Sequence, residues 1–180
     1  MRKSRDEAAR TRRRIVAAAS QSFRRNGVGA TGLGELMGAA GLTHGGFYKH
    51  FGSKDQLVAE AYAEAVDALI EKVSTDGNAA AQYLSTWHRD NPGDGCPLAA
   101  IGSELSRGDD RTRAAATDGF LRLVEVVAGQ FDGLTPKAAR RRAVVAVSTM
   151  IGALTVARIV TDPVLSEEIL KEAEKSVGGR

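Results

Sequence analysis

Apolar residues recur along most of the chain at the three- and four-residue spacing of one face of an α-helix. Near the start, Ile15, Ala19 and Phe23 lie four residues apart, and Val16 and Ala18 widen this apolar stripe. No run of alternating β-branched residues, which would indicate a strand, stands out in the rest of the sequence. The pattern therefore predicts an all-α fold of about nine helices.

The expected helices begin at residues that cap helices and end at glycine, asparagine or proline. Ser53 and Gln56 form one capping box, and Thr135 followed by Pro136 is a cap with proline at the first helical position. The expected ranges are 5–26, 31–40, 43–51, 53–74, 79–89, 97–106, 109–131, 135–161 and 162–177. The longest uncharged run, 143–157, is shorter than the roughly 20 residues of a membrane span. We therefore expect a buried helix there and no membrane partner.

Two of the expected helices are short and are joined by a tight turn that contains Gly41. Thr31 would cap the first of them, 31–40, and Thr43 would cap the second, 43–51. This layout is that of a helix-turn-helix, in which the second helix enters the major groove of DNA. The sequence predicts an α-helix of about two turns for this second element.

The composition of the second helix suits contact with DNA. Gly45 and Gly46 would let the backbone approach the double helix closely, at a cost of roughly 1 kcal/mol each in helix propensity. Tyr48 and Lys49 carry a hydroxyl and an ammonium suited to phosphate oxygens, and His44 can donate to a base or a phosphate. Phe47 and Phe51, four residues apart, are expected to face inward and anchor the helix.

The charge is divided unevenly along the chain. Residues 1–54 hold eleven Lys and Arg against three Asp and Glu, whereas residues 55–180 hold fourteen against nineteen. The basic end coincides with the predicted helix-turn-helix. Such an asymmetry indicates a polyanionic partner at that end, either nucleic acid or an anionic membrane surface.

The segment ATGLGELMGAAGLTHGGFYKHFGSKDQLVAEAY, residues 30–62, resembles the N-terminal signature of the tetracycline-repressor (TetR) family of bacterial transcription regulators. The resemblance covers about the first third of the chain. It implies a DNA-binding domain at residues 1–54, a ligand-binding and dimerisation domain at 55–180, and a homodimer on a palindromic operator in double-stranded DNA. It implies phosphate contacts at Thr31, Tyr48, His50 and Lys54, and positions along the groove at Thr43, His44, Gly45, Gly46 and Lys49. Three glycines, Gly32, Gly34 and Gly38, depart from the family pattern and predict a loose first helix.

Other interpretations of the same stretch are weaker. The run TGLGELMG is not preceded by a strand and lacks the spacing of a nucleotide-binding loop. His44 and His50 have no third metal ligand nearby, so no metal is expected. A helical corner with a solvated basic face remains open. No nucleophile with a base, paired carboxylates or cofactor motif indicates an enzyme.

The last two expected helices are the candidates for a dimer interface. The range 135–161 is apolar around more of its circumference than one core-facing stripe requires, although a buried central helix of a monomer would look the same. The interface residues that we expect are Val144, Val147, Ser148, Ile151, Gly152 and Ile159.

The resemblance further implies a pocket in the larger domain for a small-molecule effector that releases a repressor from DNA. The lining residues that we expect, each of which could instead belong to the core, are Tyr83, Trp87, His88, Cys96, Phe120, Thr149, Met150 and Leu154. Because no charged residue stands out among them, we expect an apolar or amphipathic effector.

Cys96 is the single cysteine of the chain, which excludes an internal disulfide and a multi-cysteine zinc site. It precedes Pro97, so as a helix cap its thiol pKa would fall and its reactivity would rise. A redox- or electrophile-sensing repressor is therefore one alternative, and a buried cysteine under the loop is the other. A third is a helical ligand-binding protein without specific DNA binding. We expect no signal peptide and a cytoplasmic protein, associated with the nucleoid when bound to DNA.

Overall fold

The computed structural model describes residues 2–75 and 79–178, which form nine α-helices, two 3₁₀ helices and no strand. The helices are α1 (Arg2–Asn26), α2 (Leu33–Ala39), η1 (His44–Lys49), α3 (Lys54–Thr75), α4 (Ala79–Tyr83), α5 (Thr86–Asp90), η2 (Pro92–Asp94), α6 (Pro97–Leu105), α7 (Asp110–Ala128), α8 (Pro136–Ile159) and α9 (Pro163–Gly178). The all-α prediction is confirmed.

The predicted helix starts are mostly correct because they depend on local chemistry. Ser53 Oγ accepts the backbone N–H of Gln56 at 3.0 Å, and Asp109 caps α7 by accepting the N–H of Thr112 at 2.8 Å. Thr135 caps α8, with Pro136 at its first position. The expected helix 79–89 is instead two short helices, because Ser85 stops α4 and caps α5 by accepting the N–H of His88.

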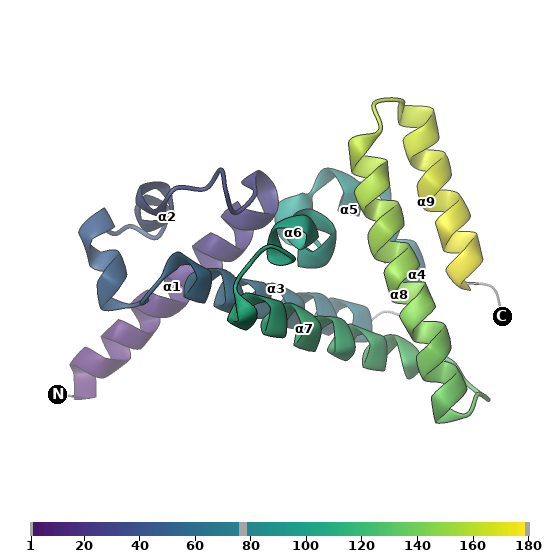
Figure 1. Cartoon of the computed structure of the whole chain (residues 1–180), viewed down its shortest axis with the longest axis horizontal. Coiled ribbons are helices and arrows are strands. Elements are labelled where there is room, and N and C mark those ends of the chain that lie inside the picture. Colours follow the sequence, from purple (N-terminus) through teal and green to yellow (C-terminus); the bar gives the residue numbers. More distant parts are fainter. Residues whose placement is uncertain (1, 76–78, 179–180) are drawn as a thin grey trace.

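The first hydrophobic core lies under the N-terminal helices. Phe23 of α1, Met37 of α2 and Phe47 of η1 are buried there together with Tyr62 of α3 and Ile101 of α6. Figure 1 shows α1, α2 and η1 forming a head at one end of an elongated molecule. Because α3 and α6 complete the core of this head, the head is joined to the rest of the chain by shared packing and not by a linker.

The second core lies at the other end, between α3, α7, α8 and α9. Val124 of α7, Val147 and Leu154 of α8, and Leu170 of α9 are its buried members. The antiparallel pair α8 and α9 stands across the ends of α3 and α7 (Figure 1). Of the described helices, α8 is the one long and apolar enough to cross a membrane by length and composition. The core helix of a soluble protein can have the same length and composition, so these two properties alone do not indicate a membrane span.

Candidate DNA-binding surface and ligand cavity

The element expected to enter the DNA groove is a short 3₁₀ helix, η1, and not the predicted two-turn α-helix. Its backbone bonds join residues three apart, such as the N–H of Gly46 to the carbonyl of Thr43 at 3.0 Å. Thr43 occupies the N-cap position, but its side chain makes no capping hydrogen bond. Two adjacent glycines have poor α-helix propensity, which accounts for the short, tightly wound element.

Aromatic packing fixes η1 on the head. Phe47 is fully buried and stacks on Phe51, with ring centroids 5.5 Å apart. Tyr48 meets the edge of Phe47 at 5.1 Å, yet 69% of its surface is exposed. The predicted inward orientation of Phe47 and Phe51 is confirmed. Phe47 and Phe51 therefore anchor η1 in the core, and the outer side of η1 faces solvent.

The outer side of η1 carries most of the residues predicted to contact DNA. Thr43, His44, Gly45, Tyr48 and Lys49 are exposed. Gly46 and His50 are half-buried beside them. These seven residues lie on η1 or at its two ends. Their contacts with DNA stay predictions.

Neither glycine of η1 is required by packing within the chain. A Cβ atom built on Gly45 would meet no atom within 4 Å, and one on Gly46 would meet only Met37 Cε at an ordinary 3.5 Å. Neither residue has a positive φ. A need for close approach by something outside the described chain is therefore the physical reason we infer for these glycines.

Thr31 and Lys54 lie away from this surface and have internal partners. Thr31 is fully buried, and its hydroxyl donates to the carbonyl of Gly27 at 2.6 Å. It does not cap α2, whose N-cap is Gly32, so that prediction was wrong. Lys54 Nζ donates to the carbonyls of Val28 and Thr31 at 2.6 and 2.7 Å. These two side chains therefore hold the turn between α1 and α2. The Thr31 hydroxyl is buried, whereas the Lys54 ammonium keeps a third N–H, and the phosphate contacts of both residues stay predictions.

An arginine clamp, which the sequence did not suggest, holds η1 between α1 and α3. The Arg12 guanidinium forms a two-pronged ion pair with the Glu60 carboxylate, and it lies 4.5 Å from the centre of the Phe51 ring. Its Nε also donates to the carbonyl of His50 at 3.4 Å. The hydrogen bonds from Arg12 hold the pKa of Glu60 below its usual value. Forty-eight residues separate the pair, so no local pattern could have indicated it.

A cavity of about 460 Å³ opens between the end of α3, α4, α5 and the η2 segment. Its walls are largely apolar, with Leu69 and Val73 from α3 and Ala79 from α4. Lys72, Gln82, Ser85 and Asp94 add polar groups around them. The volume lies in the range of small-molecule sites in proteins.

Three of the eight residues predicted to line a ligand pocket do so, namely Tyr83, Trp87 and His88. Trp87 is 57% exposed, so its ring is open to solvent. The other five do not line this cavity. Cys96, Met150 and Leu154 are buried in the second core, Phe120 packs against it, and Thr149 is half-buried on α8. The sequence did not indicate that α3 contributes to the cavity wall, because its apolar residues have the spacing of core residues.

His88 forms one wall of the cavity and is held on both ring nitrogens. Its Nδ1 lies 2.7 Å from the carbonyl of Tyr83, and its Nε2 accepts the backbone N–H of Cys96 at 2.8 Å. Only a neutral ring with its proton on Nδ1 satisfies both contacts. A Cβ on Gly95 would lie 2.3 Å from this ring, so only glycine fits there.

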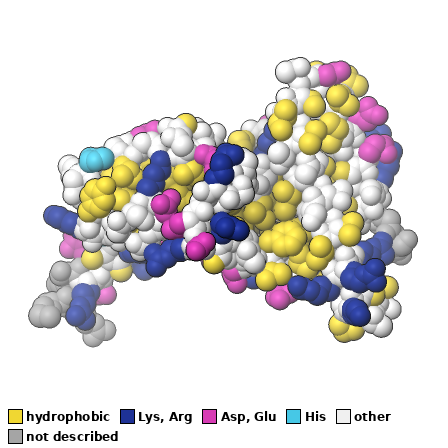
Figure 2. Space-filling model, viewed as in Figure 1, with side chains coloured by type: hydrophobic (Ala, Val, Ile, Leu, Met, Phe, Trp, Pro, Cys, Tyr) yellow, Lys and Arg dark blue, Asp and Glu magenta, His cyan; other side chains and the backbone are white. Residues whose placement is uncertain are grey.

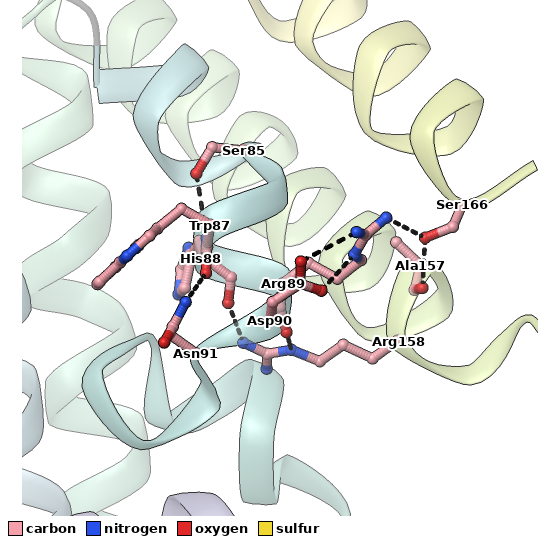
Figure 3. A network of polar contacts seen from close by, with 9 residues as sticks. All are labelled: Ser85, Trp87, His88, Arg89, Asp90, Asn91, Ala157, Arg158 and Ser166. Atoms are coloured by element: carbon pink, nitrogen blue, oxygen red, sulfur yellow. Dashed lines mark hydrogen bonds and ion pairs between the residues drawn. The ribbon is translucent and has the colours of Figure 1, made fainter. Parts of the chain in front are cut away.

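Arg158 of α8 holds α5 from the opposite side. Its guanidinium donates to the carbonyls of His88 and Arg89 at 2.6 and 3.0 Å. Arg89 in turn donates to Ser166 Oγ, which donates to the carbonyl of Ala157 at 2.7 Å. Figure 3 shows this network running from α5 to the α8–α9 corner. The network therefore joins α5, which lines the cavity, to α8 and α9, the helices expected to form the dimer interface.

Burial lowers the pKa of His88 from 6.5 to about 4. As the pH falls below 6.5 the unfolded chain binds a proton that the folded chain does not, so folding stability decreases until about pH 4. We expect a loss of up to about 3 kcal/mol over this interval, measured by urea unfolding at each pH. His88→Gln should flatten this pH dependence. An unchanged slope in His88→Gln would contradict the assignment.

Cys96 occupies the N-cap position of α6 as predicted, but the inferred consequence was wrong. The residue is fully buried, its side chain makes no capping hydrogen bond, and burial raises the pKa of its thiol. Removing the charged thiolate from water raises the thiol pKa by more than the nearby helix N-terminus lowers it. The observed arrangement is that of a buried cysteine under the loop.

An exposed apolar face covers the outer side of α8 and α9. Val145 and Ile159 of α8 are 65% and 70% exposed, and Val164 of α9 is 73% exposed. Figure 2 shows hydrophobic side chains gathered over the upper part of these two helices. Among the predicted interface residues, Ser148, Gly152 and Ile159 are exposed, and Val144 and Ile151 are half-buried. Val147 is buried in the second core and does not belong to this face.

The geometry defines a helix-turn-helix protein with a separate ligand-sized cavity, and comparisons with known proteins agree. Residues 15–61 match the family described as "Bacterial regulatory proteins, tetR family". Residues 59–165 match "Transcriptional regulator LmrA/YxaF-like, C-terminal domain". The chain therefore belongs to the TetR family of transcriptional regulators, and the suspected resemblance is confirmed.

A relative and two solved structures extend the match over most of the chain. An uncharacterised HTH-type transcriptional regulator of Mycobacterium tuberculosis is 34% identical over 84% of this chain and 86% of its own length. The structure of Escherichia coli NemR in its reduced form covers 93% of this chain and 94% of its own, with TM-score 0.75 and 21% identity. A TetR-family regulator from Cytophaga hutchinsonii covers 96% of each chain, with TM-score 0.76 and 20% identity. At these identities the two structures show the shared fold.

The functional class follows from family membership. Proteins of this family are transcriptional regulators with a DNA-binding helix-turn-helix and are generally not enzymes. Among the described residues, no group of three or more His, Cys, Asp or Glu is placed to hold a metal ion. The protein is a TetR-family transcriptional regulator.

Proposed function

We propose that this regulator is a homodimeric repressor that binds a palindromic operator through the outer side of η1. The observation that carries the proposal is the array on η1, where exposed polar side chains surround two glycines that internal packing does not require. Residues 1–54 would form the DNA-binding domain and residues 55–180 the ligand-binding and dimerisation domain. A protein acting in this way works in the cytoplasm, on the nucleoid.

The effector is a small apolar or amphipathic molecule that occupies the cavity between α3, α4 and α5. Its largely apolar walls support this class, and the polar groups around them would fix the orientation of a single polar end. Release from DNA requires only that the effector bind the DNA-incompetent conformation more tightly than the competent one.

The cavity wall is bonded directly to the head, which gives such an effector a route to the DNA-binding surface. Arg24 of α1 donates to the carbonyl of Gly95 at 2.9 Å, and Gln21 donates to the Asp94 carboxylate at 3.3 Å. Farther along, the Glu104 carboxylate of α6 accepts the backbone N–H of Gly29 at 2.8 Å. A molecule that displaces the segment 94–95 would therefore pull on α1.

The experiment that tests the proposed function is selection of duplex DNA from a random pool by the purified protein. The proposal predicts one enriched palindrome whose binding weakens steeply with salt. Salt-sensitive binding to every duplex alike would indicate a nonspecific DNA-binding protein instead. No binding at all would leave a helical ligand-binding protein, and either result would overturn the proposal.

A thiol-sensing repressor acting through Cys96 is not supported by its buried position. We expect a thiol-reactive chromogenic disulfide to label Cys96 only when the protein unfolds, at the unfolding rate. Cys96→Ser should bind the selected duplex within about twofold of the wild type, with or without hydrogen peroxide. Rapid labelling of the native protein with loss of DNA binding would restore the sensing hypothesis.

A further inference from the structure

The first turns of α1 project beyond the hydrophobic core of the head. Residues 5–10 are exposed on every side of the helix, and Ile15 is the first residue of α1 that belongs to the core. Figure 1 shows this end of α1 extending away from the body of the molecule. Apart from two alanines, every side chain from residue 2 to residue 14 is polar or charged. Packing within the described chain therefore gives no reason for these turns.

The arginines of this segment divide into two groups. Arg12 and Arg14 have structural partners, the first in the clamp to Glu60 and the second at the carbonyl of Ala40, 2.6 Å away. Arg5, Arg10 and Arg13 are exposed and make no hydrogen bond or ion pair within the described part of the chain. Replacing Arg5, Arg10 or Arg13 should therefore break no hydrogen bond or ion pair within the described part of the chain.

The placement of Arg5 is unfavourable for the helix itself. The first turn of α1 contains no acidic residue, whereas the positive end of the helix macrodipole favours acidic side chains there. Arg5 lies in this turn, and Arg10 and Arg13 lie farther along the helix, where the dipole has little effect. Helix stability therefore does not account for any of the three arginines.

The projecting end of α1 begins beside the C-terminal end of η1. Arg12 donates to the carbonyl of His50, one residue beyond the end of η1. At 1.5 Å per residue, Arg5 lies about 10 Å farther along the α1 axis than Arg12. This length is close to the width of the B-DNA major groove, about 12 Å, so a side chain this far from η1 can reach the phosphates at the edge of the groove.

We propose that the exposed arginines of the projecting end of α1, Arg5, Arg10 and Arg13, bind the phosphate backbone of duplex DNA beside the groove that η1 enters. The inference rests on the proposed function, since it places a second contact on the same DNA. Phosphate contacts carry no sequence information, so this segment adds affinity and extends the footprint without changing which sequence is chosen.

The test compares two double variants on the selected duplex over a range of salt concentrations. In Arg5→Ala/Arg10→Ala each dimer loses four phosphate contacts, so the slope of log K against log salt should fall by about 3 to 4. Affinity at about 0.1 M salt should fall at least about tenfold. The control, Lys137→Ala/Arg140→Ala, removes the same charge from exposed positions at the start of α8. It should retain the wild-type slope.

Thermal unfolding distinguishes this role from a structural one. The melting temperature of Arg5→Ala/Arg10→Ala should equal or exceed that of the wild type, because no internal contact is lost. A wild-type salt slope in this variant, while Lys49→Ala loses binding, would overturn the inference and leave the proposed function intact. Equal losses in both double variants would show a net-charge effect and would also overturn it. If the wild-type protein binds no duplex, the proposed function itself fails.

Discussion

Lys49→Ala should weaken binding to the selected duplex by about 10- to 100-fold while leaving helicity, melting temperature and dimerisation unchanged. The Lys49 side chain is exposed on the outer side of η1 and has no partner within the described residues. Its removal therefore costs the free protein nothing. The dimer loses one contact in each half-site, and two contacts at about 0.7–1.4 kcal/mol apiece account for a loss of this size. Fluorescence anisotropy with a labelled duplex measures it.

Lys54→Ala is the matched comparison, because both lysines were predicted to contact DNA. The Lys54 ammonium donates to two carbonyls in the turn between α1 and α2, so its removal should destabilise the fold by about 1–3 kcal/mol. Any loss of DNA affinity should follow that destabilisation. Unchanged affinity in Lys49→Ala would show that η1 does not contact DNA through this lysine. Unchanged stability in Lys54→Ala would show that its ammonium does not hold the turn.

Val145→Glu/Ile159→Glu should convert the proposed dimer into a folded monomer and reduce operator affinity by more than about a hundredfold. Both side chains are largely exposed in the protomer, so a carboxylate at either position costs little there. In the dimer the two charges would be buried without partners, which costs several kcal/mol. Sedimentation equilibrium gives the mass, and anisotropy gives the affinity.

The control is Leu134→Glu, at an apolar residue that is 41% exposed in the turn between α7 and α8. It adds a charge to an exposed apolar site outside the α8–α9 face, and we expect it to leave the dimer intact. A double variant that stays dimeric would place the interface elsewhere. A variant that unfolds would instead show that α8 needs these side chains within the protomer.

Local chemistry made much of the fold predictable from the sequence. Ser53, Asp109 and Thr135 cap helices because their side chains accept hydrogen bonds from backbone N–H groups three residues away. Phe47 and Phe51 were correctly predicted to face the core from their four-residue spacing, and their rings stack although Phe51 lies just beyond η1. Such features need only a few neighbouring residues, so the sequence alone carries them.

Contacts between distant segments were not predictable in this way. The ion pair between Arg12 and Glu60 joins residues 48 positions apart, and the partners of Lys54 lie more than twenty residues away. Burial raises the pKa of the Cys96 thiol in spite of its position at the start of α6. This burial depends on packing between distant segments, which the sequence alone does not indicate. The cavity likewise combines α3, α4, α5 and η2, of which the sequence indicated only part.

In the proposed dimer, two copies of η1 read two half-sites on the same side of the DNA. The measurement that tests this arrangement compares the affinity for the selected palindrome with the affinity for a version in which five base pairs are inserted between the half-sites. Half a helical turn moves one half-site to the opposite side of the duplex. Affinity should fall to the level of a single half-site, and equal affinity for both duplexes would show that the two copies of η1 do not bind in this way.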